Sequence, residues 1–152
     1  MAAALRVSEA AAMALHTLAF LAQDTTHPLT TREIATQLAG SEAHLSKVLQ
    51  RLVKLGLVIS SRGPHGGFVL GQDADSINLL HVFEAFDGAI GDVNCMQTPA
   101  RCEGTSCVFG ELVAIVNRTV RAYLMDIKLS DLRYDGTRLT KVSAKGRKGR
   151  EA

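Results

Sequence analysis

Several features are missing from this 152-residue sequence, and each absence removes a class of protein. No apolar run approaches the ~20 residues that a membrane-spanning helix needs. The Ala-rich N-terminal stretch lacks a basic n-region of any weight and is interrupted by Glu9 and His16, which argues against a signal peptide. We therefore expect a cytoplasmic protein with no membrane partner.

Catalytic patterns are lacking as well. The sequence shows no nucleophile–base pair, no paired-carboxylate motif and no phosphate-binding loop, so we do not expect an enzyme. It also shows no internal repeat, and 152 residues suit one ordinary domain. A hydrophobic fraction of 47% is typical of a folding chain.

The end of the chain differs from the rest in composition. It is rich in Lys and Arg and has almost no apolar residues; the cations are Arg138, Lys141, Lys145, Arg147, Lys148 and Arg150. Such a composition indicates a solvated terminus, with non-specific nucleic-acid contact as an alternative. The sequence predicts a single domain over residues 1–133 and a basic, disordered tail over residues 134–152.

Three helices are predicted in the first part of the domain. Residues 8–23 place Ala11, Leu15, Leu18 and Ala22 on one face of a 3.6-residue period. Thr30 and Glu33 have the spacing of a capping box and open a short helix that Gly40 closes. Ser41 caps a third helix that ends at Gly56; its predicted inward face is Leu45, Val48, Leu49 and Leu52.

The pattern then changes to that of a hairpin. Residues 57–60 and 68–70 read as two short strands, and residues 61–67 are dense in turn-forming residues. Two helices joined by a tight turn and followed by a hairpin form a winged helix-turn-helix, which we place at about residues 8–71.

Two further helices follow. One is predicted over residues 76–86 and one over residues 106–129, with a cysteine-containing loop over residues 88–107 between them. The second carries a heptad-like apolar seam of Phe109, Val113, Val116, Val120, Tyr123 and Ile127. A helix packed on its own domain is an alternative, but the stripe favours dimerisation. The expected fold class is mainly α with a small β-hairpin wing, combining a winged helix-turn-helix with a long C-terminal dimerisation helix.

The third helix and the wing carry the candidate DNA contacts. Cationic and polar side chains on the helix face opposite the leucines suit a major groove, although any surface helix carries some Lys and Arg. A cation and a His at the tip of a tight, Gly-rich loop suit a minor groove, and Gly66-Gly67 permits positive φ and close backbone approach. The predicted contact residues are Thr31, Ser41, His44, Lys47, Arg51, Arg62, Pro64, His65, Gly66 and Gly67.

All three cysteines lie in one short segment. An odd number excludes a full disulfide framework, and Cys95, Cys102 and Cys107 offer three soft ligands for an iron–sulfur cluster or for zinc. Glu111 is the nearest candidate for a fourth ligand, while Glu9 and His16 could reach the loop of a partner subunit. A reversible disulfide, a structural zinc site and plain loop cysteines stay open as alternatives.

Taken together, these motifs resemble a known family. The T-x-x-E-I-A helix from Thr30, the R-L-V-K-L-G-L-V stretch from Arg51, the wing S-x-R-G-P-x-G-G-F-x-L from Ser60 and three cysteines before a long helix are similar to the Rrf family of bacterial winged-helix transcription regulators, which has IscR-like and NsrR-like members. The resemblance covers roughly residues 5–133.

The resemblance implies a homodimer that binds a pseudo-palindromic operator in double-stranded DNA. It also implies a 2Fe–2S or 4Fe–4S cluster held by Cys95, Cys102 and Cys107 with a non-cysteine fourth ligand. Of the family's fourth-ligand positions, one falls on Gly110, one on Ala12 and one on His16, so His16 acting on the partner's cluster is favoured.

The function that follows is that of a repressor whose DNA affinity reports redox, nitric oxide or iron status. The alternative is a cluster-free thiol-redox or zinc-containing dimeric regulator that works through a protein partner.

Overall fold

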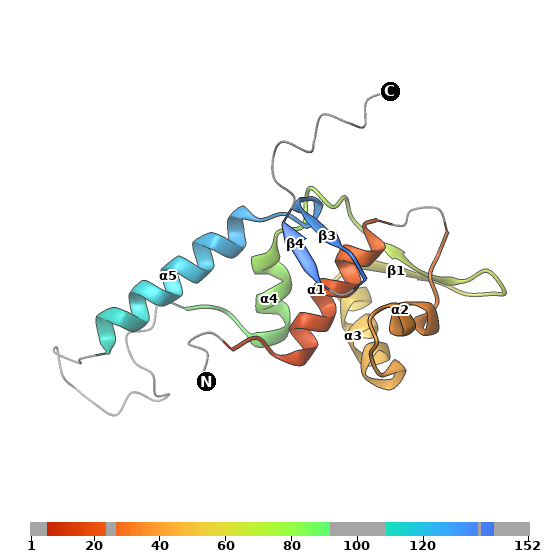
Figure 1. Ribbon diagram of the computed structural model, residues 1–152, viewed down its shortest axis with the longest axis horizontal. Helices are drawn as coiled ribbons and strands as arrows, with labels where there is room; N and C mark the ends of the chain where they lie inside the picture. The colour runs from red at the N-terminus through yellow and green to blue at the C-terminus, as the bar shows by residue number, and fades with distance from the viewer. Residues whose placement is uncertain (1–5, 24–26, 92–108, 137, 142–152) are drawn as a thin grey trace, which may run out of the picture.

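The computed structural model describes residues 6–23, 27–91, 109–136 and 138–141 of the chain. Within these residues, five α-helices and a short 3-10 turn are joined by two separate two-stranded antiparallel hairpins (Figure 1). The fold is therefore mainly helical with a small hairpin wing, as the sequence predicts.

Side-chain oxygens cap the first two helices. In α1 (Glu9–Leu21), Ser8 Oγ accepts the backbone N–H of Ala11 at 3.1 Å. Ahead of α2 (Thr31–Gln37), Thr30 Oγ1 accepts the Glu33 N–H at 3.3 Å, and the Glu33 carboxylate accepts the Thr30 N–H at 2.7 Å. The predicted capping box is confirmed. It matters because α2 is only seven residues long and is too short to be stable by helix propensity alone.

The tight turn between α2 and α3 (Glu42–Lys54) differs from the prediction in one residue. The left-handed residue is Ala39, with a φ of 48°, and not Gly40. A Cβ on Gly40 would lie 3.4 Å from the Met13 methyl group, which is ordinary van der Waals contact, so packing against α1 does not require glycine here. At the other end of α3, Gly56 has a φ of +69° and ends the helix as predicted.

The core lies where α1 packs against α3 and α4 (Leu79–Asp87). On α3 the predicted inward face of Leu45, Val48, Leu49 and Leu52 is buried, which confirms its period. The face predicted for α1 is only partly right, because Ala11 and Leu18 are buried while Leu15 and Ala22 are half-buried. Since α3, α4 and the later strand β3 (Leu132–Tyr134) all contact α1, this helix is central and buries more than one face.

The wing is a hairpin of β1 (Val58–Ser61) and β2 (Gly67–Leu70), with Val58 opposite Leu70 and Ser61 opposite Gly67. A short bridge ties β2 to the segment before α2: Leu29 N–H donates to Phe68 O at 3.0 Å, and Phe68 N–H donates to Leu29 O at 2.8 Å. The wing therefore shares backbone hydrogen bonds with the helix-turn-helix.

The two later helices are shorter than predicted. α4 begins at Leu79 and not at residue 76, because Asn78 caps it by accepting the His81 N–H at 2.8 Å. α5 (Gly110–Asp126) ends before residue 129, while residues 106–108 lie outside the described part of the chain. Its end is set by a bridge in which Leu79 N–H donates to Ile127 O and Leu129 N–H donates to Ile77 O.

A second hairpin continues the fold beyond residue 133. After a 3-10 turn (Leu129–Asp131), β3 (Leu132–Tyr134) pairs with β4 (Leu139–Lys141). Leu132 and Tyr134 are buried against the core, and Gly136 adopts a φ of +94° in the connecting turn. The predicted boundary at residue 133 is thus wrong, and Arg138 and Lys141 belong to the hairpin; residues 142–152 are outside the described chain.

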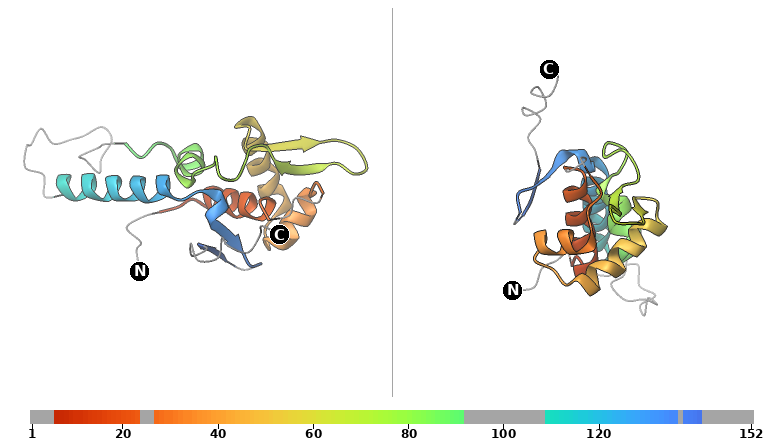
Figure 2. Two further views of the ribbon diagram at one scale, coloured as in Figure 1. Left: turned by 90° about the horizontal axis from the view of Figure 1, so that it is seen from above. Right: turned by 90° about the vertical axis from the view of Figure 1, so that its right-hand side faces the viewer.

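The subunit is elongated. α5 projects from one end and the wing from the other, with α1 and its neighbours between them (Figure 2). Among the described residues, no helix combines the length and apolarity that crossing a bilayer would need.

Candidate nucleic-acid interface and sensing residues

α3 presents a polar face on the side opposite its buried leucines. Lys47, Gln50, Arg51 and Lys54 are exposed, while Leu45, Val48, Leu49 and Leu52 are at most 3% exposed. The helical period predicted this division. Ser41 is also exposed and caps the helix by accepting the His44 N–H at 3.5 Å.

Two of the predicted contact residues are engaged within the subunit. His44 Nδ1 lies 3.5 Å from Glu9 Oε1, which connects the first turns of α3 and α1. The Arg51 guanidinium lies over the Phe86 ring of α4 at 5.0 Å from the ring centroid. Lys47 is exposed, and no ion pair or ring contact holds it within the described part of the subunit.

Thr31 is the first residue of α2 and is half-buried, whereas Thr30 before it is exposed and serves as the cap. The wing tip is exposed at Arg62, Gly63, Pro64 and His65. A hollow of about 220 Å³ separates this tip from the start of α2, and His65 and Thr30 are among the residues that line it. The wing and α2 therefore form neighbouring parts of one surface.

Of the two properties predicted for Gly66 and Gly67, close approach to a backbone is confirmed and positive φ is not. Among the described glycines, the positive φ of the wing is at Gly63 (111°), not at Gly66 or Gly67. A Cβ on Gly66 would lie 2.5 Å from Ser61 O, and one on Gly67 would lie 2.7 Å from Leu29 O. Gly66 and Gly67 therefore permit close packing against the chain's own backbone, which suffices to explain them without a DNA contact.

His16 lies in the middle of α1 and is half-buried. Its Nδ1 is 2.7 Å from the carbonyl oxygen of Ala12. Because a carbonyl oxygen only accepts, Nδ1 must carry the hydrogen, and Nε2 of the neutral ring bears the lone pair. The ring also meets Tyr134 edge to face, with centroids 5.7 Å apart.

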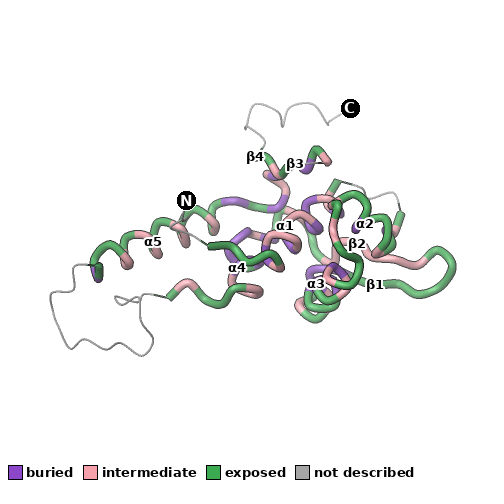
Figure 3. Tube along the Cα trace, turned by 60° about the horizontal axis from the view of Figure 1, so that its bottom comes forward, coloured by how far each residue is buried: buried purple, intermediate pink, exposed green. Residues whose placement is uncertain are grey.

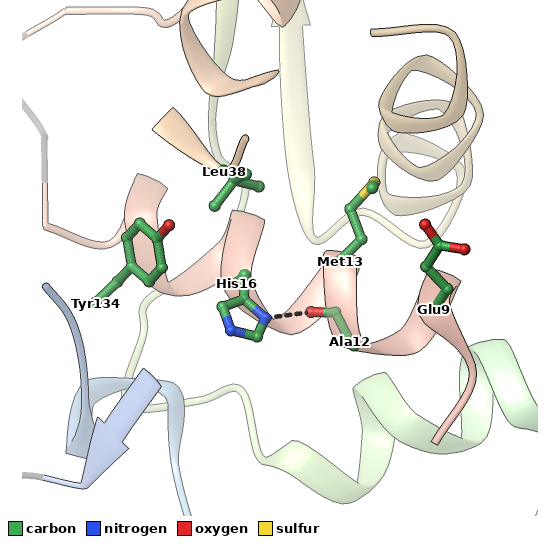
Figure 4. A pocket seen from close by; sticks show the side chains of 6 residues that line it. All are labelled: Glu9, Ala12, Met13, His16, Leu38 and Tyr134. Carbon is green, nitrogen blue, oxygen red and sulfur yellow. Dashed lines mark hydrogen bonds between the residues drawn. The ribbon is translucent and has the colours of Figure 1, made fainter. Parts of the chain in front are cut away.

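A shallow pocket of about 200 Å³ surrounds this histidine (Figure 4). Glu9, Ala12, Met13, His16, Leu38 and Tyr134 line it. Tyr134 is held there because its hydroxyl lies 3.0 Å from both Gln37 O and Gly136 O. Burial and the negative charge of Asp135 raise the pKa of Tyr134 above its ordinary value. Tyr134 was not among the residues predicted from the sequence, although the Asp135-Gly136 turn signal indicates a hairpin at this point.

The predicted thiolate ligands Cys95, Cys102 and Cys107 lie outside the described residues. In the part of the chain that is described, no three His, Cys, Asp or Glu side chains converge as a metal site. The ligand set therefore stays a prediction. Gly91 and Phe109, the residues on either side of this segment, are described.

Along α5 every residue except Gly110 is exposed or half-buried (Figure 3). Of the predicted seam, Phe109 and Tyr123 are 53% and 62% exposed, and Val113, Val116 and Val120 are half-buried. Ile127 differs, because it lies beyond the helix and is only 3% exposed in the core of its own subunit. It is therefore removed from the predicted dimer seam. Leu112, Ile115 and Met125 are exposed as well.

A helix-turn-helix, a wing at the same end and a long helix with an uncovered apolar face define a winged-helix regulator. The family model described as "Rrf2: Iron-dependent Transcriptional regulator" matches residues 7–135. The chain belongs to the Rrf2 family of transcriptional regulators, as its motifs predict, and this is a family of regulators and not of enzymes.

Curated relatives include regulators named IscR. The chain is 33% identical over 108 residues to the HTH-type transcriptional regulator IscR of Klebsiella pneumoniae (strain 342), which covers 70% of this chain and 66% of the relative. It is 31% identical over 105 residues to IscR of Yersinia pestis, covering 69% and 64%. The match thus spans slightly less than two thirds of these relatives.

Solved structures show the same fold. CymR, the global cysteine regulator of B. subtilis, superposes with a TM-score of 0.72 at 26% identity, covering 84% of this chain and 95% of that one. IscR of T. potens superposes with a TM-score of 0.69 at 23% identity, covering 84% and 85%. The second likeness concerns the fold alone.

Proposed function

We propose that the chain binds double-stranded operator DNA as a homodimer and represses transcription, with its DNA affinity set by an iron–sulfur cluster at Cys95, Cys102 and Cys107. The DNA-binding part is supported by one observation above all: the exposed polar face of α3 and the exposed wing tip lie at the same end of the subunit, away from α5 (Figures 1 and 2).

In this proposal α3 enters the major groove, where Lys47 and the start of the helix at Ser41 contact phosphates or base edges. Arg62 at the wing tip enters the adjacent minor groove, whose negative potential favours a guanidinium. Because the whole chain has a formal charge of only +2, its affinity must come from this local group of cations and not from its net charge.

The homodimer is supported by the uncovered face of α5. Pairing two copies would cover Phe109, Val116 and Tyr123 and would relate the two α3 helices by a two-fold axis. A two-fold dimer matches a pseudo-palindromic operator, since each recognition helix reads one half-site.

The sensing part is supported by the chemistry of His16. With the hydrogen on Nδ1 held by the Ala12 carbonyl oxygen, Nε2 is the ring atom that can bind iron. Three thiolates and this imidazole would supply four ligands, with His16 acting on the partner's cysteines. When bound, such a cluster would supply sensitivity to oxidants, nitric oxide or iron supply. This chain's own part is to present the imidazole and to change the orientation of the winged regions.

DNA binding is tested with an operator selected by the wild-type protein from a pool of random duplexes. Lys47→Ala and Arg62→Ala should each weaken binding about tenfold, in the range expected for loss of one phosphate or groove contact. Arg118→Ala removes an exposed cation of α5, the helix that projects from the end of the subunit opposite the wing, and should leave affinity unchanged. Unchanged affinity in both test variants would contradict the proposed docking.

Cluster binding is tested by anaerobic purification, followed by an absorption spectrum and analysis of iron, sulfide and zinc. His16→Ala should alter the spectrum or speed cluster loss, whereas His81→Ala, an exposed histidine of α4, should do neither. A colourless, iron-free protein would overturn the cluster proposal. Zinc or a reversible disulfide in its place would favour the second candidate, a cluster-free dimeric regulator that acts through a protein partner.

A further inference from the structure

The last two turns of α4 hold the residues just before the cysteine-bearing segment (residues 92–108). The Glu84 carboxylate accepts the Ile90 N–H at 3.0 Å and pairs with the Arg121 guanidinium of α5 at 2.7 Å. Arg121 also donates to the carbonyl oxygen of Ile90 at 3.4 Å. The side chains are 43% exposed for Arg121 and 24% exposed for Glu84, so solvent screens the pair only in part.

A second contact from α5 fixes the next residue. Asn117 Nδ2 donates to the carbonyl oxygen of Gly91 at 3.0 Å. Gly91 is the last described residue before residues 92–108, the segment in which all three cysteines occur. Three side chains from two helices therefore hold the two residues that directly precede this segment.

The same end of α4 also contacts the recognition helix and the start of α1. Phe86 lies under the Arg51 guanidinium, 5.0 Å from the ring centroid, and Arg51 is in the last turn of α3. Asp87 Oδ2 accepts the Ser8 N–H at 3.0 Å, just before α1 begins. Within four residues, α4 thus contacts the segment start, α5, α3 and α1.

These contacts join two parts of the molecule that the proposed function must connect. α4 has only nine residues, and a displacement of Ile90 would pull on Glu84 through a charge-assisted hydrogen bond. Because Phe86 is half a turn further along the same helix, movement of this end of α4 would alter its contact with Arg51.

We propose that Glu84, Phe86 and Arg121 form a coupling element that passes the state of the cysteine-bearing segment to the recognition helix. The inference rests on the proposed function, since it assumes that this segment senses the signal. None of the three residues binds the cluster or reads a base. They are positioning residues, and their effect is a coupling free energy between two sites, which must be reciprocal.

The first test is amide hydrogen exchange in the cluster-free protein. Arg121→Met should raise the exchange rate of the Ile90 amide about tenfold and should also raise exchange over residues 50–54 of α3. Arg118→Met, the matched control on the same helix, should change neither. Because coupling is reciprocal, Arg51→Met should raise exchange at Ile90, and its control Lys54→Met should not. Urea unfolding of each variant corrects for a change in global stability.

Two results would overturn the coupling element. One is a raised rate at Ile90 in Arg121→Met with no change in α3. The other is an unchanged rate at Ile90 in that variant. A purely local anchor gives the first result, and an Arg121–Glu84 contact that does not hold the segment gives the second.

The second test separates this inference from the proposed function. The ratio of operator affinities between cluster-reconstituted and cluster-free protein should fall at least fivefold toward one in Arg121→Met, and should stay at its wild-type value in Arg118→Met. Arg121→Lys keeps the charge opposite Glu84 and should restore part of the ratio. A wild-type ratio of one would rule out control of operator affinity by the cluster. The hydrogen-exchange experiment would still test whether Glu84, Phe86 and Arg121 couple Ile90 to α3. If the wild-type ratio differs from one and Arg121→Met has the same ratio, the coupling element is ruled out.

Discussion

The winged body and α5 use their apolar residues in opposite ways. In the body, α1, α3 and α4 bury most of their large hydrophobic side chains against one another, and Leu18, Leu49 and Leu52 are 0% exposed. In α5, Gly110 is the only buried residue among the seventeen of the helix, and the large side chains Leu112, Ile115, Tyr123 and Met125 are exposed. The body thus has a core of its own, whereas α5 contacts α4 and buries none of its large apolar side chains among the described residues. Stability and assembly should therefore be separable by mutation.

The largest effect is expected in the body. Leu49→Ala leaves a cavity at a position with 0% exposure and should lower the free energy of unfolding by about 2–5 kcal/mol in urea titrations. The matched change Leu112→Ala, at a side chain that is 53% exposed on α5, should cost far less when it is measured under conditions that keep the protein monomeric. Equal losses of unfolding free energy in the two variants would contradict the distinction between the winged body and α5.

Assembly is tested on α5. Val116→Glu places a carboxylate in the predicted seam and should weaken dimerisation about a hundredfold or more, because the charge would be desolvated on pairing. Sedimentation equilibrium measures the dimer dissociation constant, and circular dichroism checks that the helical content stays. Arg118→Glu changes the charge at an exposed position on the other side of the helix and should leave the dimer intact. A dimer that survives Val116→Glu would place the interface elsewhere.

A smaller and opposite effect is expected at a defect within the body. Thr17 is 0% exposed, and its Oγ1 is the buried side-chain polar atom recorded without a hydrogen-bond partner among the described residues. Thr17→Val removes the buried hydroxyl and should stabilise the protein by about 1 kcal/mol in thermal or urea unfolding. Thr119→Val on α5, where the hydroxyl is exposed and donates to Ile115 O at 2.8 Å, should be close to neutral. Destabilisation by Thr17→Val would show that its hydroxyl has a partner after all.

The smallest effect concerns pH and the second hairpin. Tyr134 has a raised pKa in the folded state, so folding favours the protonated phenol. Its contribution to stability is complete below the pKa of the unfolded state and is lost as the pH rises through the pKa of the folded state. Urea midpoints measured from pH 8 upward should fall more steeply for the wild type than for Tyr134→Phe, which cannot ionise. Parallel curves would mean that the hairpin does not bury this hydroxyl.

Local signals in the sequence predicted most of the winged body. The Thr30–Glu33 capping box, the cap at Ser41 and the glycine at position 56 each act within a few residues of themselves, and each is confirmed. The 3.6-residue period of α3 also predicted which side chains are buried. These features need no knowledge of the rest of the chain.

The sequence failed where distant backbone groups decide the structure. The ends of α4 and α5 depend on the bridge between Leu79 and Ile127, which no local pattern reveals. The same bridge places Ile127 in the core and not in the apolar seam. The second hairpin carried a turn signal at Asp135-Gly136, but the basic composition after it favoured a disordered tail.

In the candidate site, too, local features were predicted from the sequence and contacts between distant residues were not. The period of α3 predicted that Lys47 and Arg51 face outward, yet it could not predict that Arg51 rests on Phe86 or that His44 meets Glu9. The Glu84–Arg121 pair was missed altogether, because its partners come from separate helices and neither residue belongs to a recognisable motif.

If the chain acts as the proposed dimer, the backbone bridge between Leu29 and Phe68 has a consequence for the range of operators that the dimer could use. Since it joins the wing to the start of the helix-turn-helix, the proposed major-groove and minor-groove contacts of one subunit would keep a nearly constant separation. Operators that differ within a half-site must then be distinguished by side chains. Operators that differ in the number of base pairs between half-sites can be accommodated only where the two subunits meet.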